Sequence, residues 1–334
     1  MEHGIFITEN GWDAIARAYP QDIREELEQQ IAFLPGCLKK DALQGQQDAL
    51  KEITVAFSTW GMPCLTEEEI QRIFPNLKAV FYAAGSVQRF ARPFLSCGVR
   101  IFCAAQANAV PVAEYTVAQI LLANKGYFPA VGRCKNGWRS AHEVSVSFPG
   151  NMDCKVGIIG AGAIGKLVIS LLKPFDLEIL VFDPFLPEQT AQAMQVRKVD
   201  LQTLFRECQT ISNHLANNPQ TVGMLHYGLF SLMKPNATFI NTGRGAQVVE
   251  ADLCRAMEEA PNRTALLDVT FPEPPLPDSP LWKLDNIHIT PHIAGSMSHE
   301  IGRMGRYMLR AYEDYRDANP CALEVTAQML TTMA

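Results

Sequence analysis

Short apolar runs rich in β-branched and aromatic residues alternate with longer amphipathic stretches along the first third of the chain. The runs lie at residues 4–8, 53–57, 77–84 and 99–105. Runs of this length and composition predict buried strands, and strands that alternate with helix-length segments predict a parallel α/β sheet.

Three of the intervening segments have the features of helices. Residues 21–33 repeat apolar side chains at a spacing of four, which predicts a helix over the whole range. Thr66 stands three residues before Glu69, the spacing of a capping box, and predicts a helix start. Residues 110–126 predict a long apolar helix with Pro111 in its first turn and a glycine at its end.

A second series of strand-like runs follows, and a helix-like segment then occupies residues 300–318. Six strands within one unit are typical of a doubly wound, dinucleotide-binding fold. The six runs lie at residues 155–160, 177–183, 209–215, 237–242, 264–269 and 286–290.

The length of 334 residues is too great for one ordinary core and predicts two domains. We therefore expect an α/β protein of two doubly wound parallel-sheet domains, a Rossmann cofactor-binding domain and a flavodoxin-like substrate domain.

Composition and charge exclude several classes of protein. Hydrophobic residues at 48% and charged residues at 19% predict a packed globular chain. The net charge is −6 and no Lys/Arg block occurs, so neither nucleic acid nor anionic lipid is expected as a partner. The sequence has no apolar run of about 18 residues and no leader-like start, which predicts a cytoplasmic protein without a membrane span. Nine scattered cysteines without a CxxC pair predict reduced, mostly buried thiols and no metal site.

A glycine-rich turn follows the first strand of the second series. Gly160, Gly162 and Gly165 form a GxGxxG pattern between that strand and an apolar helix. Such glycines permit a tight turn and a close approach of pyrophosphate to backbone N–H groups. We expect this turn, with Ala163 and Ile164, to bind a dinucleotide.

Asp183 ends the next strand, eighteen residues after Gly165. A carboxylate at this place accepts hydrogen bonds from the ribose hydroxyls of the cofactor and repels a 2′-phosphate. NAD is therefore expected rather than NADP, although Arg197 and Lys198 keep NADP open as an alternative.

Four further side chains follow the ends of later strands. Arg244 lies between two glycines just after Thr242, and its guanidinium could clamp a substrate carboxylate or form a surface ion pair. Glu273 precedes His292 with one strand between them, and Asp268 ends a strand. A carboxylate bonded to one imidazole nitrogen fixes the tautomer and leaves the other nitrogen to donate a proton. The alternative is that Glu273 is an ordinary loop acid and His292 a hydrogen-bonded packing residue, but the convergence of these side chains favours carbonyl reduction by hydride transfer.

Five motifs, GAGAIG, VFDP, NTGRG, LLDVTFPEP and TPHIAG, together resemble the D-2-hydroxyacid dehydrogenase family over roughly residues 75–300. The resemblance implies a substrate domain of residues 1–107 plus 297–334, a cofactor domain of residues 108–296, and a homodimer built through the cofactor domains. It also implies catalytic roles for Arg244, Glu273 and His292, ribose binding by Asp183, a contact of Asp268 with the nicotinamide carboxamide, and cofactor binding at Thr242. Gly85 and Ser86 match a loop that donates backbone N–H groups to the substrate carboxylate.

The chain departs from the family pattern at two places. QRFARP follows Ser86 where an Asp-containing motif is usual, and ANNPQT follows His214–Leu215 where the family has an early proline. A formate dehydrogenase of the same superfamily would have glutamine in place of Glu273. The sequence therefore predicts an NAD-dependent oxidoreductase that interconverts a small 2-oxo acid and a D-2-hydroxy acid. A dinucleotide-sensing scaffold that resembles the C-terminal-binding corepressors is the alternative.

Overall fold

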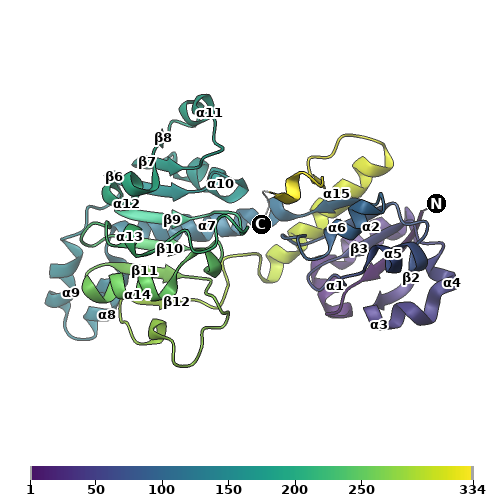
Figure 1. Ribbon diagram of the computed structural model, residues 1–334, viewed down its shortest axis with the longest axis horizontal. Coiled ribbons are helices and arrows are strands. Elements are labelled where there is room, and N and C mark those ends of the chain that lie inside the picture. The colour runs from purple at the N-terminus through teal and green to yellow at the C-terminus, as the bar shows by residue number, and fades with distance from the viewer. Residues whose placement is uncertain (1, 332–334) are drawn as a thin grey trace. The chain divides into compact units, whose positions relative to one another are not determined.

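The computed structural model describes residues 2–331, which form two compact units (Figure 1). One unit contains the chain up to Asn108 together with the chain from Ser296 onward, and the other contains Ala109–Gly295. Each boundary lies one residue from the expected position. The assignment of substrate and cofactor to these units stays a prediction.

The first unit is built on a six-stranded sheet in the order β13-β5-β4-β3-β1-β2. All strand pairs are parallel except β13 with β5. The order of the five parallel strands is that of flavodoxin-like folds, as predicted. The strands are β1 (Glu2–Ile7), β2 (Ile31–Leu38), β3 (Val55–Ser58), β4 (Ala79–Tyr82), β5 (Arg100–Cys103) and β13 (Glu324–Val325).

Helices cover both faces of this sheet (Figure 1). The predicted capping box at Thr66 is confirmed, because its side chain accepts the Glu69 N–H at 3.1 Å and its own N–H donates to the Glu69 carboxylate at 2.8 Å. The helices are α1 (Trp12–Ala18), α2 (Gln21–Glu28), α3 (Lys40–Leu43), α4 (Gln47–Leu50), α5 (Glu67–Ile73), α6 (Ala91–Ser96) and α15 (Ile301–Arg316), with 3-10 turns at Gln44–Gln46, Ser298–Glu300 and Met329–Thr331.

The helix predicted over residues 21–33 is wrong in its second half. Helix α2 ends at Glu28, and Ile31 begins strand β2, which pairs in parallel with β1. The ring of Phe33 stacks on Phe6 of β1, with centroids 4.6 Å apart. Pairing with the sheet and burial against it therefore override a local helical period that Ile31 satisfies equally well.

A row of phenylalanines runs across the middle of this sheet. Phe6, Phe57, Phe81 and Phe102 occupy register-matched positions on β1, β3, β4 and β5. The rings of Phe57 and Phe81, and those of Phe81 and Phe102, stack with centroids 4.9 Å apart. Tyr312 of α15 packs edge-on against Phe81. These cross-strand contacts fix the strand register of the unit.

The second unit contains a seven-stranded, fully parallel sheet in the order β12-β11-β10-β9-β6-β7-β8. The order matches the doubly wound dinucleotide fold with one further strand at an edge, and confirms the predicted class. The expected count of six omitted the two-residue β8. The strands are β6 (Met152–Ile159), β7 (Asp176–Phe182), β8 (Arg197–Lys198), β9 (Thr210–Asn213), β10 (Thr238–Asn241), β11 (Thr264–Leu267) and β12 (Ile287–Ile289).

The long apolar helix of the chain, α7, begins earlier than expected. It spans Ala105–Asn124, so Pro111 lies inside it rather than in its first turn. Alanines before the proline favour the helix and extend it toward β5. The other helices of the second unit are α8 (Tyr127–Cys134), α9 (Trp138–Ser145), α10 (Ala163–Leu172), α11 (Glu188–Ala193), α12 (Leu201–Glu207), α13 (Tyr227–Phe230) and α14 (Glu250–Glu259), with 3-10 turns at Gly245–Gln247 and Pro280–Trp282.

Two further expectations concern the chain as a whole. Between residues 2 and 331, none of the helices is both long and apolar enough to cross a membrane. All nine cysteines are free thiols, but Cys64 and Cys134 are exposed, so the expectation of mostly buried thiols holds only in part.

Candidate active site

The glycine-rich turn connects β6 to α10 and leaves an open space at the start of the helix. Gly160 has a φ of +91°, a conformation that favours glycine. A Cβ at Gly165 would lie 2.0 Å from the Gly160 carbonyl oxygen, so this glycine lets α10 pack on the turn. A Cβ at Gly162 would meet no atom within 4 Å, and Gly162 caps α10 without a side-chain hydrogen bond. The first N–H groups of α10, at Ala163 and beyond, are therefore free of a side-chain cap and can bind an anion.

Asp183 lies at the end of β7, beside this turn. One carboxylate oxygen accepts the Ala161 N–H at 2.7 Å and the other accepts the Phe185 N–H at 2.8 Å. These bonds hold the carboxylate against the turn while each oxygen keeps a further acceptor position. The geometry suits recognition of paired hydroxyl groups.

The two cations that left NADP open are both engaged elsewhere. Arg197 pairs with Glu207 and lies 3.2 Å from Glu178. The Lys198 ammonium donates to the Leu186 carbonyl oxygen at 2.7 Å. Both side chains therefore have protein partners in place of a phosphate group beside Asp183.

Arg244 follows β10, and its environment is largely protein. Its guanidinium donates to the Gly243 carbonyl oxygen at 2.7 Å. Burial lowers the pKa of Arg244, and the nearby charge of Glu273 opposes this shift. The residue nevertheless stays charged, because its ordinary pKa is so high. A partly desolvated cation of this kind attracts an anionic ligand strongly.

The glycines that flank Arg244 serve the protein's own packing. A Cβ at Gly245 would lie 2.0 Å from the Thr270 carbonyl carbon, and one at Gly243 would lie 3.0 Å from the Gln247 amide. A side chain at either position would collide with protein atoms, so the packing of the protein explains both glycines without a ligand.

Three buried side-chain amides are hydrogen-bonded to one another and to the backbone of Arg244, and the sequence did not predict them. The Asn213 amide nitrogen donates to Asn241 at 3.0 Å and to Gln247 at 2.6 Å. Gln247 accepts the Arg244 N–H at 3.2 Å, and Asn241 donates to the Arg244 carbonyl oxygen at the same distance. All three are fully buried. The sequence does contain one indication of this group, because each of the neighbouring strands β9 and β10 ends in an asparagine.

His292 and Glu273 are in contact in the second unit. The distance between His292 Nδ1 and Glu273 Oε1 is 2.7 Å, and both side chains are nearly half exposed, at 46% and 43%. The contact expected from the sequence is present, whereas the catalytic roles of the two residues stay a prediction. With Nδ1 engaged, Nε2 is the ring nitrogen left for a ligand.

Asp268 is buried and holds the segment that carries His292. Its Oδ1 accepts the Thr290 hydroxyl at 2.6 Å and the Ile293 N–H at 2.8 Å. Its Oδ2 accepts the Ala294 N–H at 2.9 Å. The expected contact with a carboxamide could use only the remaining acceptor position of Oδ2.

Two other polar side chains line this edge of the sheet. Thr242, predicted to bind cofactor, is buried with its hydroxyl 3.2 Å from that of Thr116 in α7. His214 is buried against the glycine turn, and burial lowers its pKa to about 3. Its Nε2 lies 2.9 Å from Ser212 Oγ, whereas Nδ1 has no hydrogen-bond partner among residues 2–331. His214 is therefore a neutral imidazole at physiological pH.

Gly85 and Ser86 belong to the other unit, where they follow strand β4 and are half-buried. The Ser86 hydroxyl accepts the Gln88 N–H at 3.5 Å. Residues after the carboxyl ends of parallel strands lie at the ligand-binding edge of such sheets. Their part in substrate binding stays a prediction.

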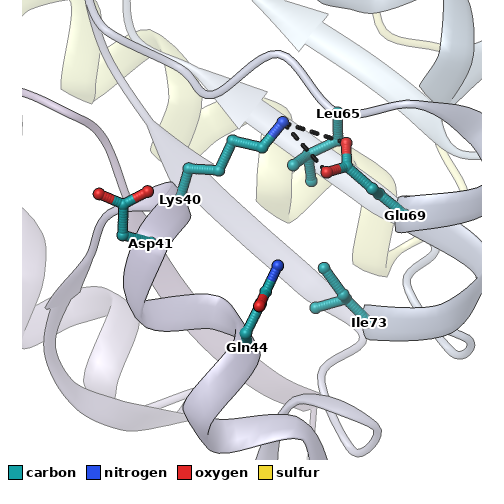
Figure 2. Close-up of a pocket in the computed structure, with 6 residues that line it drawn as sticks. All are labelled: Lys40, Asp41, Gln44, Leu65, Glu69 and Ile73. Carbon is teal, nitrogen blue, oxygen red and sulfur yellow. Dashed lines mark hydrogen bonds and ion pairs between the residues drawn. The ribbon is translucent and has the colours of Figure 1, made fainter.

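The first unit also has a surface cavity of about 290 Å³ between α3 and α5. Figure 2 shows the Lys40 ammonium pointing at the Glu69 carboxylate, 3.1 Å away. Glu69 also completes the cap of α5, and hydrogen bonds from the Thr66 backbone and Lys40 lower its pKa. The Glu69 carboxylate is already paired with Lys40 and bonded to the Thr66 N–H. We therefore interpret this cavity as a feature of packing and not as a ligand site.

The chain is similar in sequence and in fold to known proteins. The family model "D-isomer specific 2-hydroxyacid dehydrogenase, NAD binding domain" matches residues 117–294. A D-3-phosphoglycerate dehydrogenase of Archaeoglobus fulgidus is 34% identical over 232 residues, which are 69% of this chain and 44% of that protein. The putative 2-hydroxyacid dehydrogenase YoaD of Bacillus subtilis is 28% identical over 292 residues, with 84% of each chain covered.

The chain spans less than half the length of the D-3-phosphoglycerate dehydrogenases of Archaeoglobus fulgidus and Methanocaldococcus jannaschii, to which it is similar. Among solved structures, a phosphoglycerate oxidoreductase of Rhizobium etli has a TM-score of 0.81, with 99% of this chain and all of that chain covered. At 20% identity, this similarity concerns the fold alone.

Proposed function

Because the chain belongs to the D-isomer specific 2-hydroxyacid dehydrogenase family, we propose that it is an NAD-dependent oxidoreductase that interconverts a 2-oxo acid and a D-2-hydroxy acid. The hydrogen bond of 2.7 Å between His292 and Glu273, in the same unit as Arg244 and the glycine turn, carries this proposal. It supplies an oriented acid–base group where a carbonyl oxygen needs a proton.

His292 is the proton donor and acceptor of the proposed reaction. Glu273 bonds Nδ1 and stabilises the imidazolium, which leaves Nε2 to give a proton to the carbonyl oxygen during reduction. NADH, when bound, supplies the hydride that adds to the carbonyl carbon. In oxidation, Nε2 takes the hydroxyl proton of the D-2-hydroxy acid.

Arg244 is proposed to bind the substrate carboxylate and to polarise the carbonyl group. Its desolvation strengthens attraction for an anion, and a planar guanidinium can bond a carboxylate through two N–H groups. The amides of Asn213, Asn241 and Gln247 support its backbone. These contacts fix the point from which the guanidinium reaches the substrate.

The residues around the glycine turn fit a dinucleotide. The open space at Gly162 and the N–H groups at the start of α10 suit the pyrophosphate, and the Asp183 carboxylate suits the adenosine ribose. NAD is favoured over NADP because Asp183 would repel a 2′-phosphate while Arg197 and Lys198 have other partners.

We expect Asp183→Ser to weaken the preference for NADH over NADPH by about tenfold or more, since it removes both the ribose acceptor and the repulsion. The measurement is kcat/KM for each cofactor. Glu188→Gln, which removes a charge from the start of α11 nearby, should leave the ratio unchanged. If the ratio of kcat/KM with NADH to kcat/KM with NADPH is unaltered in Asp183→Ser, the proposal that Asp183 binds the adenosine ribose is wrong.

The test of the proposed function is NADH oxidation by the purified protein with pyruvate, glyoxylate, hydroxypyruvate, 2-oxobutyrate, phenylpyruvate and 3-phosphohydroxypyruvate. Turnover that collapses in Arg244→Ala but survives in Arg206→Ala, a change at an exposed residue of α12, would support the dehydrogenase. NADH binding without turnover of any of these acids would contradict it and favour the dinucleotide-sensing scaffold.

We also infer that two copies of the chain associate through the second unit. Helices α8 and α9 expose Tyr127, Val131 and Trp138, and exposed apolar side chains that cluster in this way mark protein contacts. Light scattering that gave the mass of a single chain at micromolar concentration would contradict this inference.

A further inference from the structure

The segment 290–296, which carries His292, is hydrogen-bonded to α7 near both of its ends. Near the start, the Thr290 hydroxyl lies 3.1 Å from the Tyr115 hydroxyl. At the end, the Ser296 N–H donates to the side-chain oxygen of Asn108 at 3.0 Å. Asn108 and Tyr115 are seven residues apart and therefore lie on nearly the same face of the helix.

The direction of the hydrogen bonds from Tyr115 is determined by chemistry. The Asp268 carboxylate can only accept, so the Thr290 hydroxyl must use its single proton in the 2.6 Å bond to Oδ1. The Tyr115 hydroxyl must then donate to Thr290. Tyr115 is thus the outer donor of a chain that ends on the buried carboxylate.

The Asp268 carboxylate in turn fixes the backbone on the far side of His292. It accepts the N–H groups of Ile293 and Ala294 at 2.8 and 2.9 Å. A carboxylate that rotates away from these donors would leave buried N–H groups unpaired, which is costly. The Thr290 hydroxyl, oriented by Tyr115, opposes that rotation.

His292 depends on this support because its own backbone is in a disfavoured conformation. Its φ is +54°, in the left-handed region that side chains with a Cβ seldom adopt. Its N–H donates to the carbonyl oxygens of Asp268 and Thr290 at 3.0 and 2.9 Å. Surrounding bonds must hold such a residue in place.

We propose that Tyr115 is a positioning residue for His292, acting through Thr290 and the Asp268 carboxylate. The inference rests on the role proposed above for His292 in proton transfer. Tyr115 itself touches neither His292 nor Glu273 through any hydrogen bond of the described residues, so its effect passes through the segment.

The test compares Tyr115→Phe, Thr290→Val and their double variant with the unaltered protein. Removing the hydroxyl of Tyr115 should lower kcat about three- to tenfold and move the pH profile of kcat. Hydrogen exchange of the peptide that contains Ile293 and Ala294 should rise by a similar factor. Tyr227→Phe, which removes a hydroxyl bonded to Glu259 elsewhere in the same unit, should change neither.

Two further comparisons separate positioning from a general loss of structure. In the double variant, kcat should fall no lower than in Thr290→Val, because both changes break one chain. Thr290→Ser, which keeps the hydroxyl, should restore kcat, the pH profile and slow exchange. Additive losses, or a serine variant as impaired as the valine variant, would overturn the proposal.

The exchange measurement makes this test independent of turnover. If the unaltered protein reduces none of the 2-oxo acids but Tyr115→Phe still accelerates exchange at Ile293 and Ala294, the proposed function fails while the structural link stands. If the unaltered protein turns over and Tyr115→Phe changes neither kcat nor exchange, the positioning role is wrong and the dehydrogenase remains.

Discussion

Turnover of a 2-oxo acid is expected to fall by about 10²- to 10⁴-fold in His292→Ala, the usual contribution of a positioned acid–base group. The imidazole is the proton donor of the proposed reaction, and its bond to Glu273 has no substitute in the alanine variant. Among residues 2–331, His292 is hydrogen-bonded to Glu273, Asp268 and Thr290 and not to the glycine-rich turn proposed to bind the cofactor, so the Kd for NADH should change less than twofold. Steady-state NADH oxidation and fluorescence titration measure the two quantities.

A matched control is His142→Ala on α9, where the ring stacks on Trp138 and the side chain is exposed. This change should leave kcat as it is. Glu273→Gln should lower kcat less than His292→Ala, because the amide can still bond Nδ1 but no longer stabilises the imidazolium. Full activity in His292→Ala would remove the acid–base role from this residue.

Gly165→Ala is expected to disrupt cofactor binding and to lower the free energy of unfolding by about 1–3 kcal/mol. The added Cβ would lie 2.0 Å from the Gly160 carbonyl oxygen, so α10 must move away from the turn. That movement displaces the N–H groups that would face the pyrophosphate, and NADH affinity should drop by tenfold or more. Thermal unfolding and NADH titration report the two effects.

Gly162→Ala separates packing from binding at the same turn. No atom lies within 4 Å of the position of its Cβ, so the melting temperature should stay close to that of the unaltered protein. The same Cβ occupies the space assigned to the cofactor, and NADH affinity should fall. If Gly165→Ala unfolds at the same temperature as the unaltered protein, the close contact between α10 and the turn is wrong.

Features that depend on neighbours in the chain were predictable from the sequence. The glycine turn, the strand-end position of Asp183 and the capping box at Thr66 all follow from short spacings, and the structure has each of them. Strand alternation likewise identified the doubly wound class of both units. In these cases the local signal and the tertiary structure agree.

Features that depend on distant partners were missed or misread. Ile31 satisfies a helical period, but pairing with β1 makes it a strand residue. The need for glycine at position 245 comes from the backbone of Thr270, which follows a later strand and lies where a Cβ would be. Asp268 accepts hydrogen bonds from residues about 25 positions later in the chain, and the hydrophobic periodicity of the sequence gives no sign of these bonds. The sequence patterns therefore predicted the residues of the candidate site, but not the distant residues that pack against them or bond to them.

The buried amides of Asn213, Asn241 and Gln247 constrain how this part of the sequence can change over evolution. Each amide donates to or accepts from another, and water cannot replace a lost partner because all three are fully buried. A single substitution removes hydrogen bonds from at least two neighbouring groups, so its cost should depend strongly on what occupies the other two positions. The three sites should therefore show strong epistasis, and a saturation library should recover tolerated changes there mainly as joint replacements.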